Sequence, residues 1–188
     1  MKNVKQEAIN AQGDVAGRDI NKTFNLNLTE KRSKYLCSLM EKFKKERDDN
    51  IQISTIIDEL THYKTPIISE NIIGLENKLR KGNREDLIDD ALITKEKFTK
   101  KLLKYEAFES AQGIYAYLLA HVYYNFKMHI LPLIIEKKYD NSEINIFIDE
   151  KVIEPLYSEL DENVLNIFKD EINGMLYFLT GNCHIKWM

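Results

Sequence analysis

The residues best suited to chemistry lie near the end of the chain, where Cys183 and His184 are neighbours. A thiol beside an imidazole could supply two metal ligands, or a thiolate with its base. Adjacent side chains of an extended segment point to opposite sides, so either role requires a third residue. His121 and His129 would lie about 12 Å apart along a helix, too far to share a metal ion. We therefore predict no catalytic centre, no metal site and no cofactor. An enzyme built from Cys183, His184 and an unidentified carboxylate stays an open alternative.

A second candidate site is the glycine-marked segment GDVAGRDI at 13–20. It lacks the Lys-Ser/Thr ending of a phosphate-binding P-loop, and its two aspartates cannot supply the roughly six oxygens of a calcium site. Ile20, Phe24, Leu26 and Leu28 are spaced mostly by two, as in a half-buried strand, so we predict a β arm over 1–28. A lone strand is unstable in water, and the arm should pair with its own domain, a second copy or a partner. Its expected contact residues are Gly13, Asp14, Gly17, Arg18, Asp19 and Ile20.

Two basic clusters could bind nucleic acid. One spans 78–84, and the other forms a stripe along one side of a helix. The chain has 27 basic and 30 acidic residues, a net charge of -3, and aromatic residues are not interleaved with the clusters. We therefore expect solvated faces and regard nucleic acid as a disfavoured partner, while a small nucleic-acid-binding protein stays the alternative function. The stripe residues are Lys97, Lys100, Lys101 and Lys104.

The bulk composition indicates one domain with a short N-terminal extension. A chain of 188 residues with 44% hydrophobic content can bury a core without disulfides or metals. Cys37 and Cys183 are expected to be free thiols in a reducing compartment. The N-terminus has no apolar leader, and the apolar stretch 114–135 contains four polar residues that a bilayer would penalise. We therefore expect a cytoplasmic protein with no membrane segment.

The spacing of apolar residues predicts a helical body over 29–188, a compact bundle of about six or seven helices. Pro132 should bend or end the regular part of its helix, and Pro155 fits best in a first turn. The alternation at 144–148 suggests a short strand or an extended connector. The helices are expected at about 30–47, 51–63, 72–81, 84–108, 110–138, 152–160 and 164–179.

The last helix is expected to begin near Asp161, as its cap, and to stop at Gly181. Cys183, Ile185 and Trp187 could then alternate to one side as a short final strand, giving an extended C-terminal tail. Trp187 is large enough to anchor this tail in its own core or in a partner pocket, and core packing is the favoured reading. The tail residues expected to serve interaction or packing are Tyr177, Gly181, Asn182, Cys183, His184 and Trp187.

Three segments together carry a resemblance to a known family. The arm at 13–20, VIEPL at 152–156 and GMLYFLTGNCHIKW at 174–187 resemble the C-terminal domain found in bacterial ABC-three-component systems, across nearly the whole chain. The resemblance implies a system that combines an ABC-type ATPase, a small middle component and a third protein, whose C-terminal domain couples an effector to the other two. It also implies defence against phage or other invading DNA.

For this chain, the resemblance implies an interaction role and no catalytic residues. An effector domain commonly precedes the domain in the family, whereas only 12 residues precede the arm here, so we expect no fused effector. The expected function is that of a non-enzymatic coupling component, held through its arm and tail by an ABC-type ATPase and a middle component. Self-association through the arm would make it a homo-oligomer.

Overall fold

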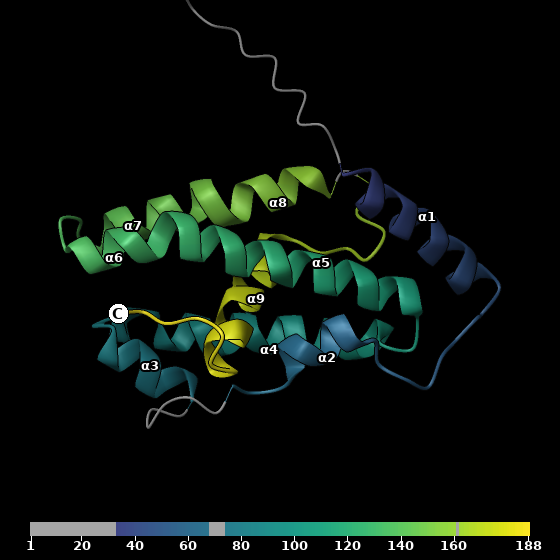
Figure 1. Ribbon diagram of the computed structural model, residues 1–188, viewed down its shortest axis with the longest axis horizontal. Coiled ribbons are helices and arrows are strands. Elements are labelled where there is room, and N and C mark those ends of the chain that lie inside the picture. Colours follow the sequence, from purple (N-terminus) through teal and green to yellow (C-terminus); the bar gives the residue numbers. More distant parts are fainter. Residues whose placement is uncertain (1–32, 68–73, 161) are drawn as a thin grey trace, which may run out of the picture. The chain divides into compact units, whose positions relative to one another are not determined.

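The computed structural model describes residues 33–67, 74–160 and 162–188, and every regular element in these ranges is a helix (Figure 1). The predicted mainly α fold is confirmed. The described ranges hold seven helices when two helices that are each interrupted by a π turn are counted once, within the predicted six or seven. The β arm expected over 1–28, with its six contact residues, lies outside the described residues. The helices are α1 (Lys34–Asp48), α2 (Asp58–Lys64), α3 (Leu75–Lys81), α4 (Ile88–Tyr105), α5 (Glu109–Asn125), α6 (Leu131–Glu136), α7 (Asn141–Ile148), α8 (Glu154–Glu159) and α9 (Lys169–Gly181).

Two rods are each interrupted by a π turn. The turn Phe126–Ile130 joins α5 to α6, the turn Asp149–Ile153 joins α7 to α8, and the two turns contact each other. The rods lie side by side in Figure 1. Pro132 and Pro155 each follow a π turn by two residues, in the first turn of α6 and α8. A proline lacks its N–H and crowds the carbonyl of the preceding turn, so the wider π turn allows each rod to continue. Each π turn therefore lies directly before a proline, where the loss of a backbone N–H predicts irregular helix geometry.

The predicted short strand or extended connector at 144–148 is wrong, because these residues belong to α7. Asp140 caps this helix by accepting the backbone N–H groups of Ser142 and Glu143, while the Glu143 side chain accepts the N–H of Asp140. Ile144 and Ile148 are buried four residues apart, as one face of a helix requires. Ile146 is exposed, and this exposed isoleucine made a helical face look like strand alternation.

The segment expected to form the start of the second helix is instead non-helical. Helix α2 begins at Asp58, whereas the prediction placed its start at residue 51. The backbone N–H of Ile53 donates to the Ala107 carbonyl at 2.8 Å, and that of Ile57 donates to the Gln112 side chain at 2.7 Å. Contacts with the α4–α5 connection and with α5 therefore replace the hydrogen bonds that a longer helix would have made.

Helix α5 supplies much of the core, as its apolar sequence predicts. Ten of its residues are buried. Within the described ranges, no helix has the length and apolar character needed to span a membrane.

Helix α9 lies between α4 and the α5–α6 rod (Figure 1). Nine of its 13 residues are buried. Gly174 allows the close approach to α4, because a Cβ at this position would lie 2.2 Å from the carbonyl oxygen of Thr94. The close packing of α9 on α4 therefore requires a glycine at residue 174.

The predicted start of the last helix is wrong, whereas its predicted end at Gly181 agrees with the structure. Residues 163–168 form an irregular loop whose Leu165 and Ile167 are buried, so an apolar pattern that looked helical comes from a loop packed on the core. The helix begins only at Lys169, and Asp161 lies outside the described residues. At the other end, Gly181 is the last helical residue, and Cys183 with φ 68° takes the left-handed position after it.

Candidate functional site

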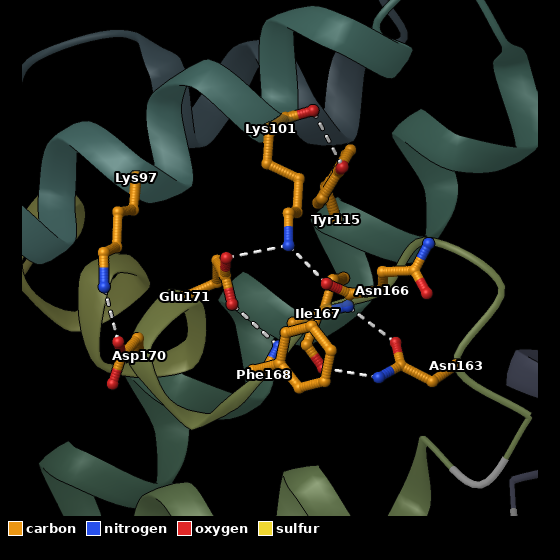
Figure 2. Close-up of polar contacts among 9 residues, drawn as sticks. All are labelled: Lys97, Lys101, Tyr115, Asn163, Asn166, Ile167, Phe168, Asp170 and Glu171. Carbon is orange, nitrogen blue, oxygen red and sulfur yellow. Dashed lines mark hydrogen bonds and ion pairs between the residues drawn. The ribbon is translucent and has the colours of Figure 1, made fainter.

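The predicted basic stripe connects α4 to α9 (Figure 2). The Lys97 ammonium lies 2.6 Å from the Asp170 carboxylate, and the Lys101 ammonium lies 2.7 Å from that of Glu171. The hydrogen bond from Lys97 to Asp170 raises the pKa of Lys97. Two of the four lysines therefore pair with the first turn of another helix, where carboxylates also interact favourably with the helix dipole.

The other two stripe lysines also have partners. Lys100 pairs with Glu96 at 2.6 Å on its own helix, and Lys104 lies 5.0 Å from the ring centroid of Tyr105. Three of the four lysines thus face a carboxylate. A lysine paired with a carboxylate must give up that partner to neutralise a phosphate, so the pairs disfavour nucleic-acid binding by the stripe.

Glu171 is central to this polar network. Its side chain is largely buried, and its two oxygens have different partners. One accepts from the Lys101 ammonium, and the other accepts the backbone N–H of Phe168 at 2.8 Å (Figure 2). The carboxylate therefore satisfies the start of α9 and holds α4 against it.

The loop before α9 is closed by Asn163. Its side chain donates to the carbonyl of Ile167 and accepts the N–H of the same residue, both at 2.7 Å. Lys101 donates to the carbonyl of Asn166 in the same loop, and its own carbonyl accepts from the Tyr115 hydroxyl at 3.1 Å (Figure 2). Burial raises the pKa of Tyr115, which keeps this donor protonated. Lys101 thus connects α4, α5 and the loop.

Sequence reasoning missed Asn163, Asn166 and Glu171. The two asparagines have φ values of 37° and 52°, and asparagine is one of the few residues that adopts this region readily. Their spacing in a short segment between helices is the signal that could have identified a tight loop. Glu171 gave no such signal, because Phe168 stands where a capping box would have a serine or threonine.

Trp187 is packed inside the domain. Its side chain is 2% exposed, and its indole N–H donates to the Thr180 hydroxyl at 3.1 Å. The ring meets Phe126 edge-on at 5.1 Å and stacks on Tyr177 at 6.4 Å. Burial raises the pKa of Tyr177 to about 12. Gly82 makes room for the tryptophan, because a Cβ there would lie 2.6 Å from the Trp187 Cβ. The tail is therefore anchored in its own core.

The turn before Trp187 is a helix-ending motif, so the predicted final strand is wrong. The N–H of Cys183 donates to the Thr180 carbonyl at 3.1 Å, and that of His184 donates to the Leu179 carbonyl at 2.9 Å, as in a Schellman motif. The Asn182 side chain donates to the Tyr63 carbonyl at 2.9 Å. Ile185 and Trp187 are buried and Lys186 is exposed, so the expected alternation begins only after the turn.

His184 is a buried aromatic residue of this turn. Its ring centroid lies 5.2 Å from that of His62 and 5.5 Å from that of Tyr63. Burial, and secondarily the charge of His62, lowers the pKa of His184. Cys183 is a free, partly exposed thiol. In the part of the chain that the structure describes, no group of three His, Cys, Asp or Glu residues is placed to hold a metal ion.

The second basic cluster, at 78–84, is divided between the interior and the surface. Lys78 and Arg84 are buried, whereas Arg80 is exposed and pairs with Glu76 at 3.3 Å. The Arg84 guanidinium lies 5.2 Å from the Trp187 ring centroid. These side chains therefore do not form one basic face.

The fold and these contacts define an all-helical domain whose C-terminal segment completes its core. Residues 74–187 match the family model described as CTD9, the C-terminal domain 9 of the ABC-three component (ABC-3C) systems. The match covers more than half of the chain, from the start of α3 to Trp187, and the chain belongs to this family. Neither a curated protein nor a solved structure matches the chain.

Proposed function

We propose that this protein is the non-enzymatic coupling component of an ABC-three-component system, which binds an ABC-type ATPase and a middle component and acts in defence against phage or other invading DNA. The observation that carries the proposal is the family match over 74–187. A domain of a multi-component system requires protein partners. The contacts of Cys183 and His184 support binding over catalysis, because both residues serve a helix-ending turn.

The burial of the tail changes where such partners would bind. Trp187 and Tyr177 are core residues, so the tail supports the domain from within. Partner contacts then fall to the N-terminal arm, as the sequence predicts, and to the outer faces of the helices. The nucleic-acid alternative gains no support from the lysine stripe, because its ammonium groups pair with Glu96, Asp170 and Glu171.

One outer face carries large apolar side chains along the α5–α6 rod. Tyr124 and Met128 are 57% and 50% exposed. Their spacing of four residues keeps both side chains on one side of the rod. Exposed apolar residues that gather on one surface are typical of protein-binding sites. We assign this face, named the α5–α6 face, to the ATPase or the middle component.

Co-expression of the full chain with the ABC-type ATPase and the middle component tests the proposal. Affinity capture followed by light scattering should give a stable complex. Met128→Glu, with Tyr124→Ser, should weaken capture and leave the circular dichroism of the free protein unchanged. Ile146→Glu on α7 is a matched control, because Ile146 is also 57% exposed and lies outside this face. Failure of the folded wild-type chain to bind either component would refute the coupling role.

A further inference from the structure

A cavity of about 600 Å³ lies where the end of α3, the turn between α6 and α7, and the tail meet. Its size is that of a small-molecule site. Trp187 and Gly82 form part of its wall, so the residues that anchor the tail also shape the cavity. The family match gives this cavity no role, and the coupling role proposed above does not require it.

Three cationic side chains line the cavity, those of Lys81, Arg84 and Lys137, and no acidic side chain in the described part of the chain lines it. Lys137 occupies a left-handed position with φ 54°, which ends α6. The next residue, Lys138, pairs with Glu136 at 3.3 Å, and neither lines the cavity. The Lys138–Glu136 ion pair therefore lies outside the group of cations that lines the cavity.

Arg84 is the buried member of this group. Its side chain is 3% exposed, and its only carboxylate contact in the described ranges is a long one, 3.4 Å from Nε to Asp86. One terminal nitrogen, Nη2, donates to the Asn145 side chain. The other, Nη1, has no hydrogen-bond partner in the described part of the chain. The buried guanidinium therefore keeps a positive charge beside the cavity without a close carboxylate, and this charge favours an anion there.

Another part of the wall is apolar, where Ile134, Ile135 and Ile144 line it together with Trp187. The polar side chains of Asn83, Tyr139 and Asn141 also line the cavity. Apolar surface of this kind favours a ligand with a hydrocarbon or aromatic body rather than a bare inorganic ion. Charge at one part of the wall and apolar surface at another define an amphipathic ligand.

We propose that this cavity binds a small organic anion, whose carboxylate or phosphate group faces Lys81, Arg84 and Lys137 and whose apolar body packs on Ile134 and Ile135. The anionic head group is the chemistry common to both ligand types. Since the ligand would contact residues beside Trp187, binding stabilises the packing of the tail in the folded state.

The single tryptophan of the chain provides the measurement. Titration of the full chain with octanoate and with octyl phosphate should change the Trp187 fluorescence saturably and raise the melting temperature. Octan-1-ol and octylammonium, with the same hydrocarbon body and a neutral or cationic head, should do neither. The anion that binds more tightly identifies the head group. Equal binding of all four probes, or of none, overturns the proposal, and binding of inorganic phosphate as tight as octyl phosphate overturns the apolar part.

Variants on the exposed rim separate binding from folding. Lys81→Glu and Lys137→Glu should each weaken the anion about fivefold, since each reverses a charge near the head group. Lys138→Glu is the matched control, because Lys138 lies outside the wall and should bind like wild type. All three residues are exposed, so circular dichroism should be unchanged. Unaltered affinity in the Lys81→Glu, Lys137→Glu double variant contradicts the site, whether or not the coupling role holds.

Discussion

The ammonium of Lys101 on α4 lies 2.7 Å from the carboxylate of Glu171 on α9, with the two side chains only 19% and 11% exposed. This pair also holds the Asn166 carbonyl and the Phe168 N–H. The basic stripe suggests a nucleic-acid surface, but its most buried lysine forms an ion pair that connects α4 to α9. The Lys101 ammonium therefore stabilises the folded domain rather than offering a free charge to a ligand.

Replacing Lys101 by alanine should destabilise the domain by about 2–4 kcal/mol, because Glu171 is left largely buried without its counter-ion. Lys100→Ala is the control, since its pair with Glu96 is exposed and should contribute little. Urea unfolding monitored by circular dichroism measures both changes. Equal stability of the two variants would show that the Lys101–Glu171 pair does not hold the helices together.

The sequence was sufficient for the helical class because helix-spaced apolar residues determine which faces are buried. The sequence also predicted irregular helix geometry near Pro132 and a first-turn position for Pro155, since the missing N–H of a proline affects only the adjacent turn. It failed at 163–168, where a loop packs buried apolar residues on the core, and at the lysine stripe. The partners of Lys97 and Lys101 lie 73 and 70 residues away, and helical spacing carries no information on such long-range pairs. The cavity beside Trp187 was missed for the same reason.

Gly174→Ala should be strongly destabilising, by about 3 kcal/mol or more, because the new methyl group would meet the Thr94 backbone, which cannot move away. Gly181→Ala provides a contrast within the same helix. There the nearest atom is the flexible Lys95 ammonium at 2.8 Å, and alanine favours the helix. Thermal unfolding should therefore show a large loss for the first variant and little loss or a small gain for the second. Similar losses would mean that the close approach of α9 to α4 is not required.

Trp187→Ala should lower the free energy of unfolding by about 3–5 kcal/mol, through the cavity it creates and the hydrogen bond that Thr180 loses. Trp187→Phe should recover part of the loss, because the ring contact with Phe126 can persist. Chemical unfolding compares the three proteins, and partner capture is measured on the folded fraction. A folded Trp187→Ala variant that cannot capture its partner would instead assign the tail to an interface.

The predicted arm can be tested in the full chain. Ile20→Asp places a charge on the apolar side of the expected strand and should abolish pairing through the arm. If the wild-type protein is an oligomer by light scattering, the variant should be a monomer with unchanged helical circular dichroism. Lys2→Asp, also near the N-terminus but outside the GDVAGRDI segment, is the control and should keep the wild-type mass. An oligomer that survives Ile20→Asp excludes assembly through this residue.

The stability of the domain should depend on the protonation of His184. Burial lowers its pKa below the ordinary value of 6.5, so the unfolded chain binds more protons than the folded domain as the pH falls through that range. The contribution is fully present above about pH 6.5 and is lost as the pH falls towards the lower folded-state value, by about 1.4 kcal/mol for each unit of lowering. His184→Gln should reduce this acid sensitivity, whereas His129→Gln, at an exposed position, should not. The free energy of unfolding at about pH 7.5 and about pH 5 gives the comparison. The same pH dependence in wild type and His184→Gln would show that another group controls it.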